Sequence, residues 1–530
     1  MSPKNKRNVP KGTGTKYLPN RPELPPGAPV LFIHPSKQGL RFNPDGDFGR
    51  PYGLVPVGIP GIINLIRQNG IDVRGINHSL EMQLNKNFNL KNWLLGQRDA
   101  RVILIDMHWY EHCYGAIDAA RLCKQVHPEA WTVLGGLSAS GFAREILENF
   151  KEVDIIVRGD GERPALELVQ NLLATHDRQD AWSILPRIPN LTYHSPDGIV
   201  ENPLTYTGAT EDLDQLDFVD LSFMEHAREY SVHEYIVTDL SRARQALDAS
   251  PFRGRWLTTA RGCKYECAYC GGGKSAHKVL ANRTGIVVRS PEKVVDDLVR
   301  LQETGITQAS LAYDIAEMGQ DYWQSFFADM RNKQVKLGIY NEFFQMPGFD
   351  FVEDMVRSVD REHSCVALSP LSGNERVRRL NGKHFSNTQL FDMLELLSRH
   401  KMYLFVYFSL NLPGETNETF VETLELAREI YFYYPNSLLK ILNSVHTIDP
   451  LSPMNVKADR FGVQSSMVSF MDFYQYCQDT GQKDPGSRIG LHRGFELADP
   501  ESRSLKHMAD AWDKEREGKE ISWWPIPPSW

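Results

Sequence analysis

The sequence is short of cysteine, of long apolar runs and of excess charge, and each shortage excludes a class of protein. Seven cysteines among 530 residues are too few for a disulfide-rich secreted scaffold. No stretch of 18 apolar residues occurs, so no transmembrane helix is predicted. A formal net charge of −8 gives no sign of a polyanionic partner, which disfavours sequence-nonspecific nucleic-acid binding.

The length of 530 residues predicts more than one domain, and the composition is that of an ordinary globular protein. The first segment is basic and rich in glycine and proline, with no apolar core after it, so we expect a flexible arm and not a signal peptide. A possible hairpin at 190–200 lies in the segment expected to link the two main domains. The expected segments are an arm (1–28), a strand–helix domain (29–165), a linker or cap (166–254), a second strand–helix domain (255–455) and a small, mostly helical segment (456–530).

Three of the seven cysteines lie in one short stretch, WLTTARGCKYECAYCGGGKS, with the spacing C-x3-C-x2-C. The next cysteine along the chain is Cys365, so no fourth thiolate is near. A structural zinc site needs four protein ligands, usually from two C-x2-C pairs, and only one pair is present. Three thiolates can hold three irons of a [4Fe–4S] cluster and leave the fourth iron open. Chance clustering in a surface loop is disfavoured, because so few cysteines are available.

The segment 29–165 alternates short apolar runs with helical patterns, which is typical of an open, doubly wound parallel sheet. The loops that follow its strands are rich in glycine and polar residues. Ligands of such sheets bind at the carboxyl ends of the strands. The expected strands are 30–35, 71–75, 101–109, 131–136 and 153–162.

The segment 255–455 repeats the strand–helix alternation six times, and its first strand leads straight into the cysteine stretch. Six parallel strands with six helices predict an open (β/α)6 barrel whose reactive face lies at the carboxyl ends of the strands. The expected strands are 255–262, 306–314, 336–344, 364–372, 402–414 and 438–450.

The cysteine spacing, with Tyr269 before the last cysteine, resembles the signature of the radical SAM superfamily. Three turns resemble those after strands four, five and six of that family: SPLSGNE (369–375), LPGET (412–416) and IDPLSP (448–453). Two of them depart from the usual pattern, since Asn411 and Leu451 stand at glycine positions. The segment 29–165 resembles the cobalamin-binding domain of B12-dependent members, in particular class B methyltransferases.

This resemblance implies three cofactors, namely a [4Fe–4S] cluster, S-adenosylmethionine (SAM) and cobalamin. The expected cluster ligands are Cys263, Cys267 and Cys270. The expected SAM-binding residues are Tyr269, Gly271, Gly272, Ser369, Ser372, Asn374, Glu375, Pro413 and Gly414. The expected cobalamin-binding residues are Pro35, Ser36, Lys37, His108, Trp109, Gly135, Gly136, Ser138, Gly159, Asp160 and Glu162. The expected substrate-pocket residues are Tyr313, Asp314, Glu342 and Tyr407.

The chain lacks the Asp-x-His-x-x-Gly loop that supplies a histidine to cobalt in cobalamin mutases. An HxxG string occurs at 112–115, but Tyr110 stands at the aspartate position and the string follows the third strand, so we interpret it as accidental. We therefore expect cobalamin to bind without a histidine ligand, with His108 and Trp109 near its lower face. The other interpretation of His108, a hydrogen-bonded histidine at a strand end, stays open.

The resemblance implies a C-methyltransferase, in which a 5′-deoxyadenosyl radical abstracts hydrogen and methylcobalamin donates the methyl group. One candidate substrate is a protein or peptide side chain such as glutamine. The alternative is a cobalamin-dependent rearrangement or cyclisation of a small molecule. A tRNA methylthiotransferase would need three more cluster cysteines upstream, and a cobalamin sensor would need no open iron.

Two further expectations concern the surroundings of the protein. An oxygen-labile cluster indicates a reducing cytoplasm. The same cluster needs a low-potential electron donor, such as ferredoxin or flavodoxin.

Overall fold

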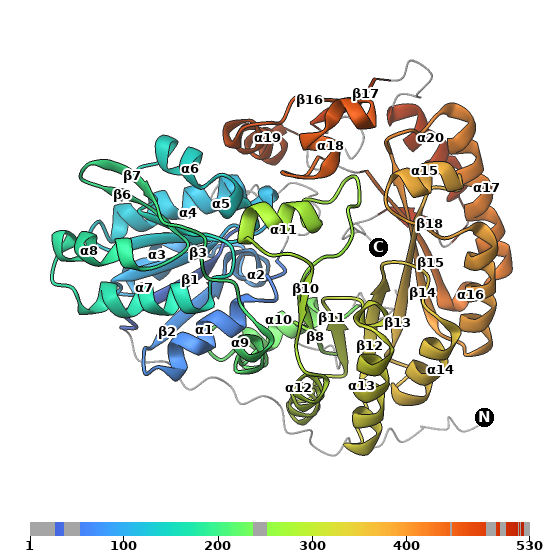
Figure 1. Cartoon of the computed structure of the whole chain (residues 1–530), viewed down its shortest axis with the longest axis horizontal. Coiled ribbons are helices and arrows are strands. Elements are labelled where there is room, and N and C mark those ends of the chain that lie inside the picture. Colours follow the sequence, from blue (N-terminus) through green and yellow to red (C-terminus); the bar gives the residue numbers. More distant parts are fainter. Residues whose placement is uncertain are drawn as a thin grey trace, which may run out of the picture.

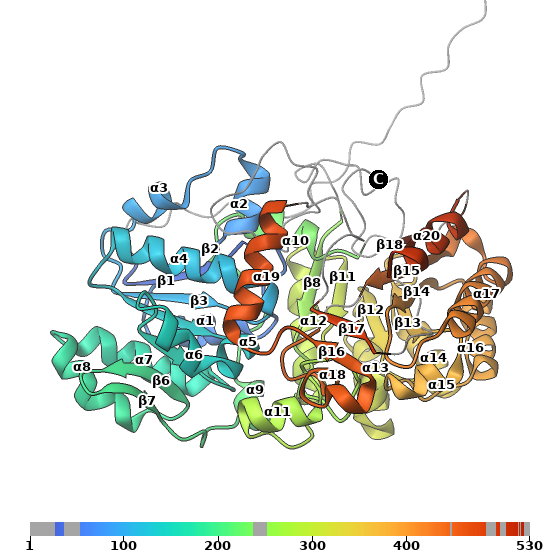
Figure 2. The ribbon, with the colours of Figure 1, turned by 90° about the horizontal axis from the view of Figure 1, so that it is seen from above.

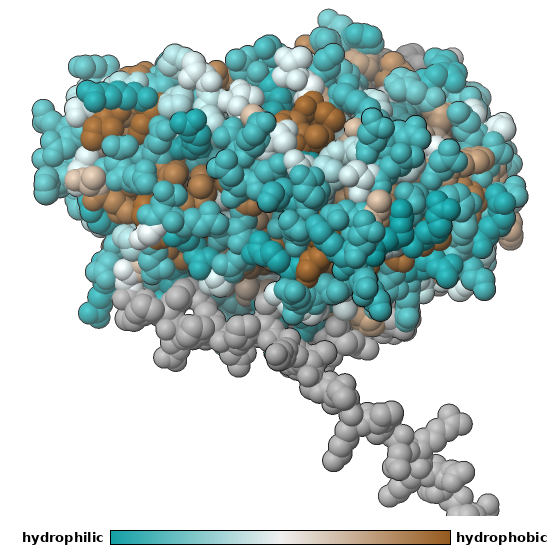
Figure 3. Space-filling model, turned by 60° about the horizontal axis from the view of Figure 1, so that its bottom comes forward, coloured by the Kyte–Doolittle hydropathy of each residue, from teal (hydrophilic) through white to brown (hydrophobic). Residues whose placement is uncertain are grey.

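The computed structural model describes residues 27–36, 53–236, 252–445, 448–483, 494–498, 505–517, 519 and 521–523. Nearly all of the expected arm (1–28) and the predicted cobalamin residue Lys37 lie outside this part of the chain. Two parallel sheets with their helices stand side by side (Figure 1). Among the described residues, no helix has the length and apolar character needed to cross a bilayer. On the face in Figure 3, apolar side chains form separate patches among hydrophilic ones.

The first sheet has the strand order β2-β1-β3-β4-β5-β6-β7. Its five parallel strands confirm the predicted doubly wound domain. They are β1 (Val30–His34), β2 (Val73–Asn77), β3 (Val102–Asp106), β4 (Trp131–Gly135) and β5 (Ile155–Val157). Strands β1 and β3 are buried along their whole length, because helices cover both faces. One face carries α1 (Ile59–Gln68) and α7 (Glu162–Ala174), and the other α3 (Leu90–Leu95), α4 (Cys113–Val126) and α6 (Ala143–Asn149).

The hairpin expected inside the linker is instead part of the first sheet. Its strands, β6 (Leu191–Ser195) and β7 (Gly198–Glu201), extend the first sheet, since β6 pairs antiparallel with β5. The inward side chains Leu191 and Tyr193 are buried in the core of the first domain. The first sheet therefore continues well beyond residue 165.

The second sheet has the order β18-β15-β14-β13-β12-β11-β8 and curls into an open barrel with helices outside (Figures 1 and 2). Its first six strands are β8 (Gly254–Leu257), β11 (Gln308–Leu311), β12 (Gly338–Phe343), β13 (Cys365–Leu371), β14 (Tyr403–Leu410) and β15 (Leu439–Val445). The outer helices are α12 (Pro291–Glu303), α13 (Gln320–Asn332), α14 (Phe349–Ser358), α16 (Asn387–Arg399), α17 (Asn417–Tyr433) and α20 (Leu505–Glu515). Their apolar faces and the outward side chains of the strands form the largest core.

Two details of the barrel differ from the prediction. The expected first strand, 255–262, is divided into β8 and β9 (Ala260–Gly262), because β9 leaves the barrel and pairs antiparallel with β10 (Ile286–Val288). A seventh strand, β18 (Ile521–Trp523), comes from the C-terminal segment and pairs with β15. Burial of Ile521 against the barrel core accounts for its position.

The C-terminal segment contacts both domains. Helix α19 (Phe470–Lys483) packs on α4 of the first domain (Figure 2). Its Phe470 and Phe473 also meet the ring of Phe142, directly before α6, at 5.7 and 5.5 Å between centroids. Helix α20 and β18 pack on the barrel instead. The segment includes β16 (Val463–Ser465) and β17 (Phe495–Leu497) besides its helices.

Candidate active site

The cysteine loop joins β9 to α11 (Lys274–Ala281) at the carboxyl end of the barrel. Its three cysteines are half-buried and form no disulfide. The Tyr265 N–H donates to Cys263 Sγ at 3.4 Å, and the Gly272 N–H donates to Cys270 Sγ at 3.3 Å. Backbone N–H donors toward cysteine sulfur are one means by which proteins tune iron–sulfur clusters. Three free thiols on one loop, two of them with such donors, fit a cluster with one open iron.

Two neighbouring turns hold this loop in place. The Gly271 N–H donates to Asp449 Oδ2 at 3.1 Å, from the turn after β15. On the other side Gly382, with φ of +93°, lies so close that an added Cβ would be 2.8 Å from the Cys267 Cα. The sequence prediction missed Gly382 and Asp449. The IDPLSP turn was the available signal for Asp449, whereas nothing local marks Gly382.

The predicted SAM residues fall into two groups. Ser369 faces the barrel interior and donates to Glu342 Oε1 at 3.0 Å, and Tyr269 packs on apolar side chains of the turns after β13 and β14. The polar groups of Ser372, Asn374 and Glu375 instead bind within their own turn or to neighbouring helices. The Pro413 carbonyl accepts from Asn381, and Gly414 packs near Leu380. Ligand binding by all these residues and by Gly271 and Gly272 stays a prediction.

The predicted cobalamin residues gather at the carboxyl edge of the first sheet. Gly136 has φ of +113°, and an added Cβ would lie 2.7 Å from the backbone of His108, so only glycine fits there. The Ser138 N–H and hydroxyl both donate to the His108 carbonyl at 3.1 Å. The rings of His108 and Trp109 meet edge to face at 4.8 Å. The approach of His108 thus explains the glycine at 136, and cobalamin binding at this edge stays a prediction.

Two more of these predicted residues, Pro35 and Ser36, are buried just after β1. The neighbouring His34 contacts Asp106 at 2.9 Å, and the second oxygen of Asp106 has no hydrogen-bond partner in the part of the chain that the structure describes. Enclosure lowers the pKa of His108 to about 4. Asp106 opposes that shift, while His277 of α11 and Arg261 add to it. The helix after the cysteine loop therefore lies near the predicted cobalamin edge.

The last of these residues, Gly159, Asp160 and Glu162, lie against the barrel. Asp160 Oδ1 is 3.3 Å from Arg261, which also pairs with Glu162, and Asp160 Oδ2 pairs with Arg283. Gly159 touches α11, since an added Cβ would lie 2.9 Å from the Ala281 Cα. We call the two arginines with Asp160 and Glu162 the interdomain ion cluster. Its Arg261 lies two residues before Cys263, so the ion pairs connect the start of the cysteine loop to the first domain.

The four predicted substrate residues do not lie together. Glu342 and Tyr407 are half-exposed on inward positions of β12 and β14. Asp314 is buried behind them, where it accepts from the N–H groups of Ala316 and Phe344 and from Asn341. Burial raises its pKa to about 7. The ring of Tyr313 packs edge-on against Phe344 at 5.0 Å.

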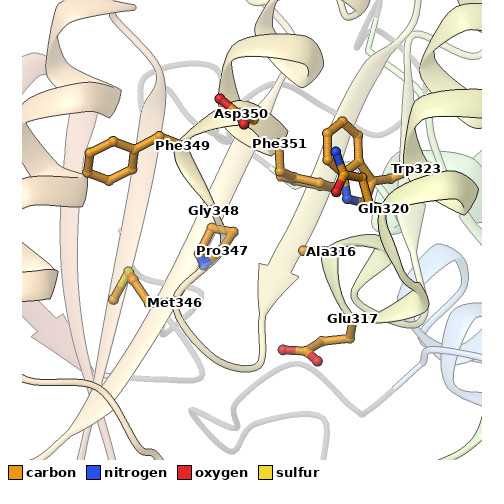
Figure 4. A pocket seen from close by; sticks show the side chains of 10 residues that line it. All are labelled: Ala316, Glu317, Gln320, Trp323, Met346, Pro347, Gly348, Phe349, Asp350 and Phe351. Carbon is orange, nitrogen blue, oxygen red and sulfur yellow. The ribbon is translucent and has the colours of Figure 1, made fainter.

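An open pocket of about 350 Å³ lies outside the barrel, between the loops after β11 and β12 (Figure 4). Its lining includes Trp323, Met346 and Phe351. Glu317 on its rim pairs with Lys264 of the cysteine loop at 2.5 Å. This pocket is separate from the inward positions of the strands.

Comparison with known proteins agrees with this geometry. Residues 257–427 match the model of the Radical SAM superfamily. Hopanoid C-3 methylase of Methylococcus capsulatus is 25% identical over 320 residues, which cover 56% of this chain and 54% of that protein. Anaerobic magnesium-protoporphyrin IX monomethyl ester cyclase of Cereibacter sphaeroides is 24% identical over 319 residues, 59% of this chain and 47% of that protein. The chain thus spans about half the length of these curated relatives.

The whole fold has solved counterparts. The methyltransferase TsrM from Kitasatospora setae, solved with cobalamin and a [4Fe–4S] cluster, aligns with a TM-score of 0.61 at 15% identity, covering 92% of this chain and 88% of that one. The cobalamin-dependent radical SAM enzyme OxsB aligns with a TM-score of 0.50 at 12% identity, covering 92% and 61%. The fold is therefore that of a doubly wound domain joined to a radical SAM barrel. Residues 257–427 therefore form a radical SAM domain, which agrees with the resemblance predicted from the cysteine loop.

Proposed function

We propose that this protein is a cobalamin-dependent radical SAM methyltransferase that methylates an unactivated carbon. The observation that carries the proposal is the interdomain ion cluster, which joins the start of the cysteine loop to the carboxyl edge of the first sheet. The cysteine loop and the carboxyl edge of the first sheet are thereby held next to each other. The relatives and the solved counterparts support the same class.

In this proposal Cys263, Cys267 and Cys270 hold the cluster, and the edge at His108 and Gly136 receives cobalamin. When bound, the cluster with SAM supplies a hydrogen-abstracting radical, and cobalamin supplies the methyl group. The chain's own residues position these groups and exclude water. Asp449 and the turn at Gly382 fix the loop from two sides. The barrel wall encloses the substrate, and its outward side chains form a continuous apolar core.

The test uses the reconstituted protein with labelled SAM and a low-potential reductant. We expect 5′-deoxyadenosine, S-adenosylhomocysteine and a labelled methylated product. Replacing any of Cys263, Cys267 or Cys270 with Ala should abolish deoxyadenosine formation and leave cobalamin bound. Cys123→Ala, in the core that contains α4, should retain deoxyadenosine formation. A protein that binds no cobalamin after reconstitution would contradict the proposal.

A second candidate is rearrangement or cyclisation without methyl transfer, which the similarity to the cyclase of Cereibacter sphaeroides favours. S-adenosylhomocysteine separates the two, since only methyl transfer produces it. A glutamine side chain as substrate, a ferredoxin or flavodoxin donor and the cytoplasmic location stay predictions.

A further inference from the structure

The interior of the barrel is lined by every second residue of its strands. Outward residues such as Ala309, Ile339 and Val366 belong to the core beneath the helices. Their neighbours in sequence therefore point inward. The inward side chains are Trp256, Gln308, Ser310, Tyr340, Glu342, Cys365, Ala367, Ser369, Phe405, Tyr407, Ser409, Lys440, Leu442 and Ser444.

The floor of this interior is closed. Gln308, at the amino end of β11, accepts from the Ile236 N–H at 2.7 Å and donates to the Ile236 and His363 carbonyls at 3.3 and 2.7 Å. Below it the rings of Tyr235 and Phe252 stack at 5.3 Å, and His363 packs against Phe252 at 5.6 Å. A substrate must therefore enter from the carboxyl ends of the strands, beside the cysteine loop.

Above the floor the wall is aromatic. Trp256 meets Tyr340 edge to face at 5.7 Å, and Phe405 meets Tyr407 in the same way at 6.2 Å. Tyr340 and Phe405 are buried, whereas Trp256 and Tyr407 keep part of their surface exposed. Rings in edge-to-face contact offer their remaining faces and edges to another flat group.

Among the described residues, two buried donors on this wall have no hydrogen-bond partner. They are the Ser310 hydroxyl and the Trp256 indole N–H. Ser310 and Trp256 are paired residues on the adjacent strands β11 and β8, so both donors lie on the same inward face. Gln308, one inward position below, has partners for its amide oxygen and for both of its amide N–H groups. Leaving a buried polar group unpaired costs about 1–3 kcal/mol, so such a pair marks a place for a ligand oxygen or a water that a ligand displaces.

Two charged side chains belong to the interior. Lys440 is buried on β15, with its Nζ 5.3 Å from the centre of the Phe405 ring. Glu342 on β12 accepts from Ser369. The strand register places both of them one inward position above Ser310 and Trp256.

On the basis of the proposed function, we infer that the substrate is a compact aromatic carboxylate that enters the barrel carboxylate first. Its two carboxylate oxygens accept from Ser310 Oγ and Trp256 Nε1, just above the closed floor. Its ring lies against Tyr340, Phe405 and Tyr407. The far side of the ring then faces the cysteine loop, where reaction takes place.

The test is calorimetric titration of the cofactor-loaded protein with three matched probes: indole-3-propionate, its amide, and cyclohexanepropionate. We expect the first to bind at least tenfold more tightly than either of the others. Ser310→Ala and Trp256→Phe should each weaken indole-3-propionate about tenfold and leave the amide nearly unchanged. Ser183→Ala and Trp182→Phe are the matched controls, since both residues lie in the first domain and bond to backbone carbonyls.

Equal affinities for the acid and its amide, or unchanged affinity in both barrel variants, would overturn the inference. A tripeptide that ends in tryptophan is titrated with a free and with an amidated C-terminus, to separate a peptide end from a free small molecule as the source of the carboxylate. The source is a peptide if the tripeptide binds with its free C-terminus and not with the amidated one. Deoxyadenosine formation is measured in parallel. A wild-type protein that makes deoxyadenosine but binds none of the carboxylates refutes the substrate class alone, and one that binds them but makes no deoxyadenosine refutes the proposed function alone.

Discussion

Replacing Gly382 with Ala should displace a cluster ligand without touching any cysteine. The added Cβ would be 2.8 Å from the Cys267 Cα and 3.0 Å from its Sγ. Ordinary van der Waals contact begins at 3.4 Å, so the backbone of one partner must move by about 0.6 Å. The obstacle is backbone, which no rotamer change can relieve.

That displacement is large on the scale of metal coordination. Distances in a metal site hold to within about 0.2 Å, so a shift three times as large weakens or breaks one of three iron–sulfur bonds. The left-handed backbone at Gly382 adds a separate cost of about 1–2 kcal/mol for alanine. The left-handed backbone lowers stability alone, whereas the displacement of Cys267 also acts on the cluster.

Gly305→Ala is the matched control, because Gly305 has φ of +85° and nothing within 4 Å of an added Cβ. Both variants should lose thermal stability through the left-handed backbone, and Gly382→Ala should lose more because of its clash with Cys267. Only Gly382→Ala should show reduced iron and sulfide per chain after reconstitution and reduced deoxyadenosine formation. Normal iron content in Gly382→Ala, or equal loss in both variants, would refute the reasoning.

Two other predictions test the interdomain ion cluster and a buried carboxyl. Arg261→Ala leaves Asp160 and Glu162 short of a partner, at a cost of about 3–5 kcal/mol, so hydrogen exchange at residues 158–162 should become faster. Arg144→Ala breaks an exposed pair and should leave the exchange at these residues unchanged. Unchanged exchange in both variants would contradict the role of the interdomain ion cluster. Burial raises the pKa of Glu415 from 4.5 to about 8, so the folded protein keeps a proton that the unfolded chain loses. Stability should therefore fall as pH rises from about 5 to 8, by up to about 1.4 kcal/mol per pH unit. Glu415→Gln should remove this contribution from thermal unfolding midpoints measured across that range, and an unchanged slope would contradict the assignment.

The architecture could be predicted because its signals are local. Five strands of the first sheet and six of the barrel are apolar runs that end at turns, and each was predicted, although the predicted ends run up to five residues past the strand, as at β5 and β15. The strand β18 could not be found in this way. Three residues, Ile-Ser-Trp, carry no periodicity, and only the exposed edge of β15 makes them a strand. The hairpin at β6 and β7 was visible, but its place beside β5 depends on the core that Leu191 and Tyr193 enter.

The candidate site was predicted only in part, for a related reason. The cysteines, His108 and Gly136 belong to motifs that are contiguous in sequence. Contacts between distant segments leave no such pattern. The sequence shows only that Asp160 lies in a glycine-rich loop. Its ion-pair partner Arg261 lies about a hundred positions further along the chain. The requirement for glycine at position 382 likewise comes from a residue distant in sequence, because Cys267 lies against it.

The C-terminal segment explains why these distant contacts persist. Helix α19 buries Phe470 and Phe473 against the first domain, while α20 and β18 complete the barrel. The core around α4 also contains Ala268 of the cysteine loop and Met454 from the turn after β15, whose N–H donates to the Ala268 carbonyl at 2.9 Å. The cysteine loop is thus packed into the core of the first domain as well as bonded to it by the ion cluster. Apolar packing and charge pairs act on the same loop from different sides, so the spacing between the loop and the edge at Gly136 is fixed by both domains together.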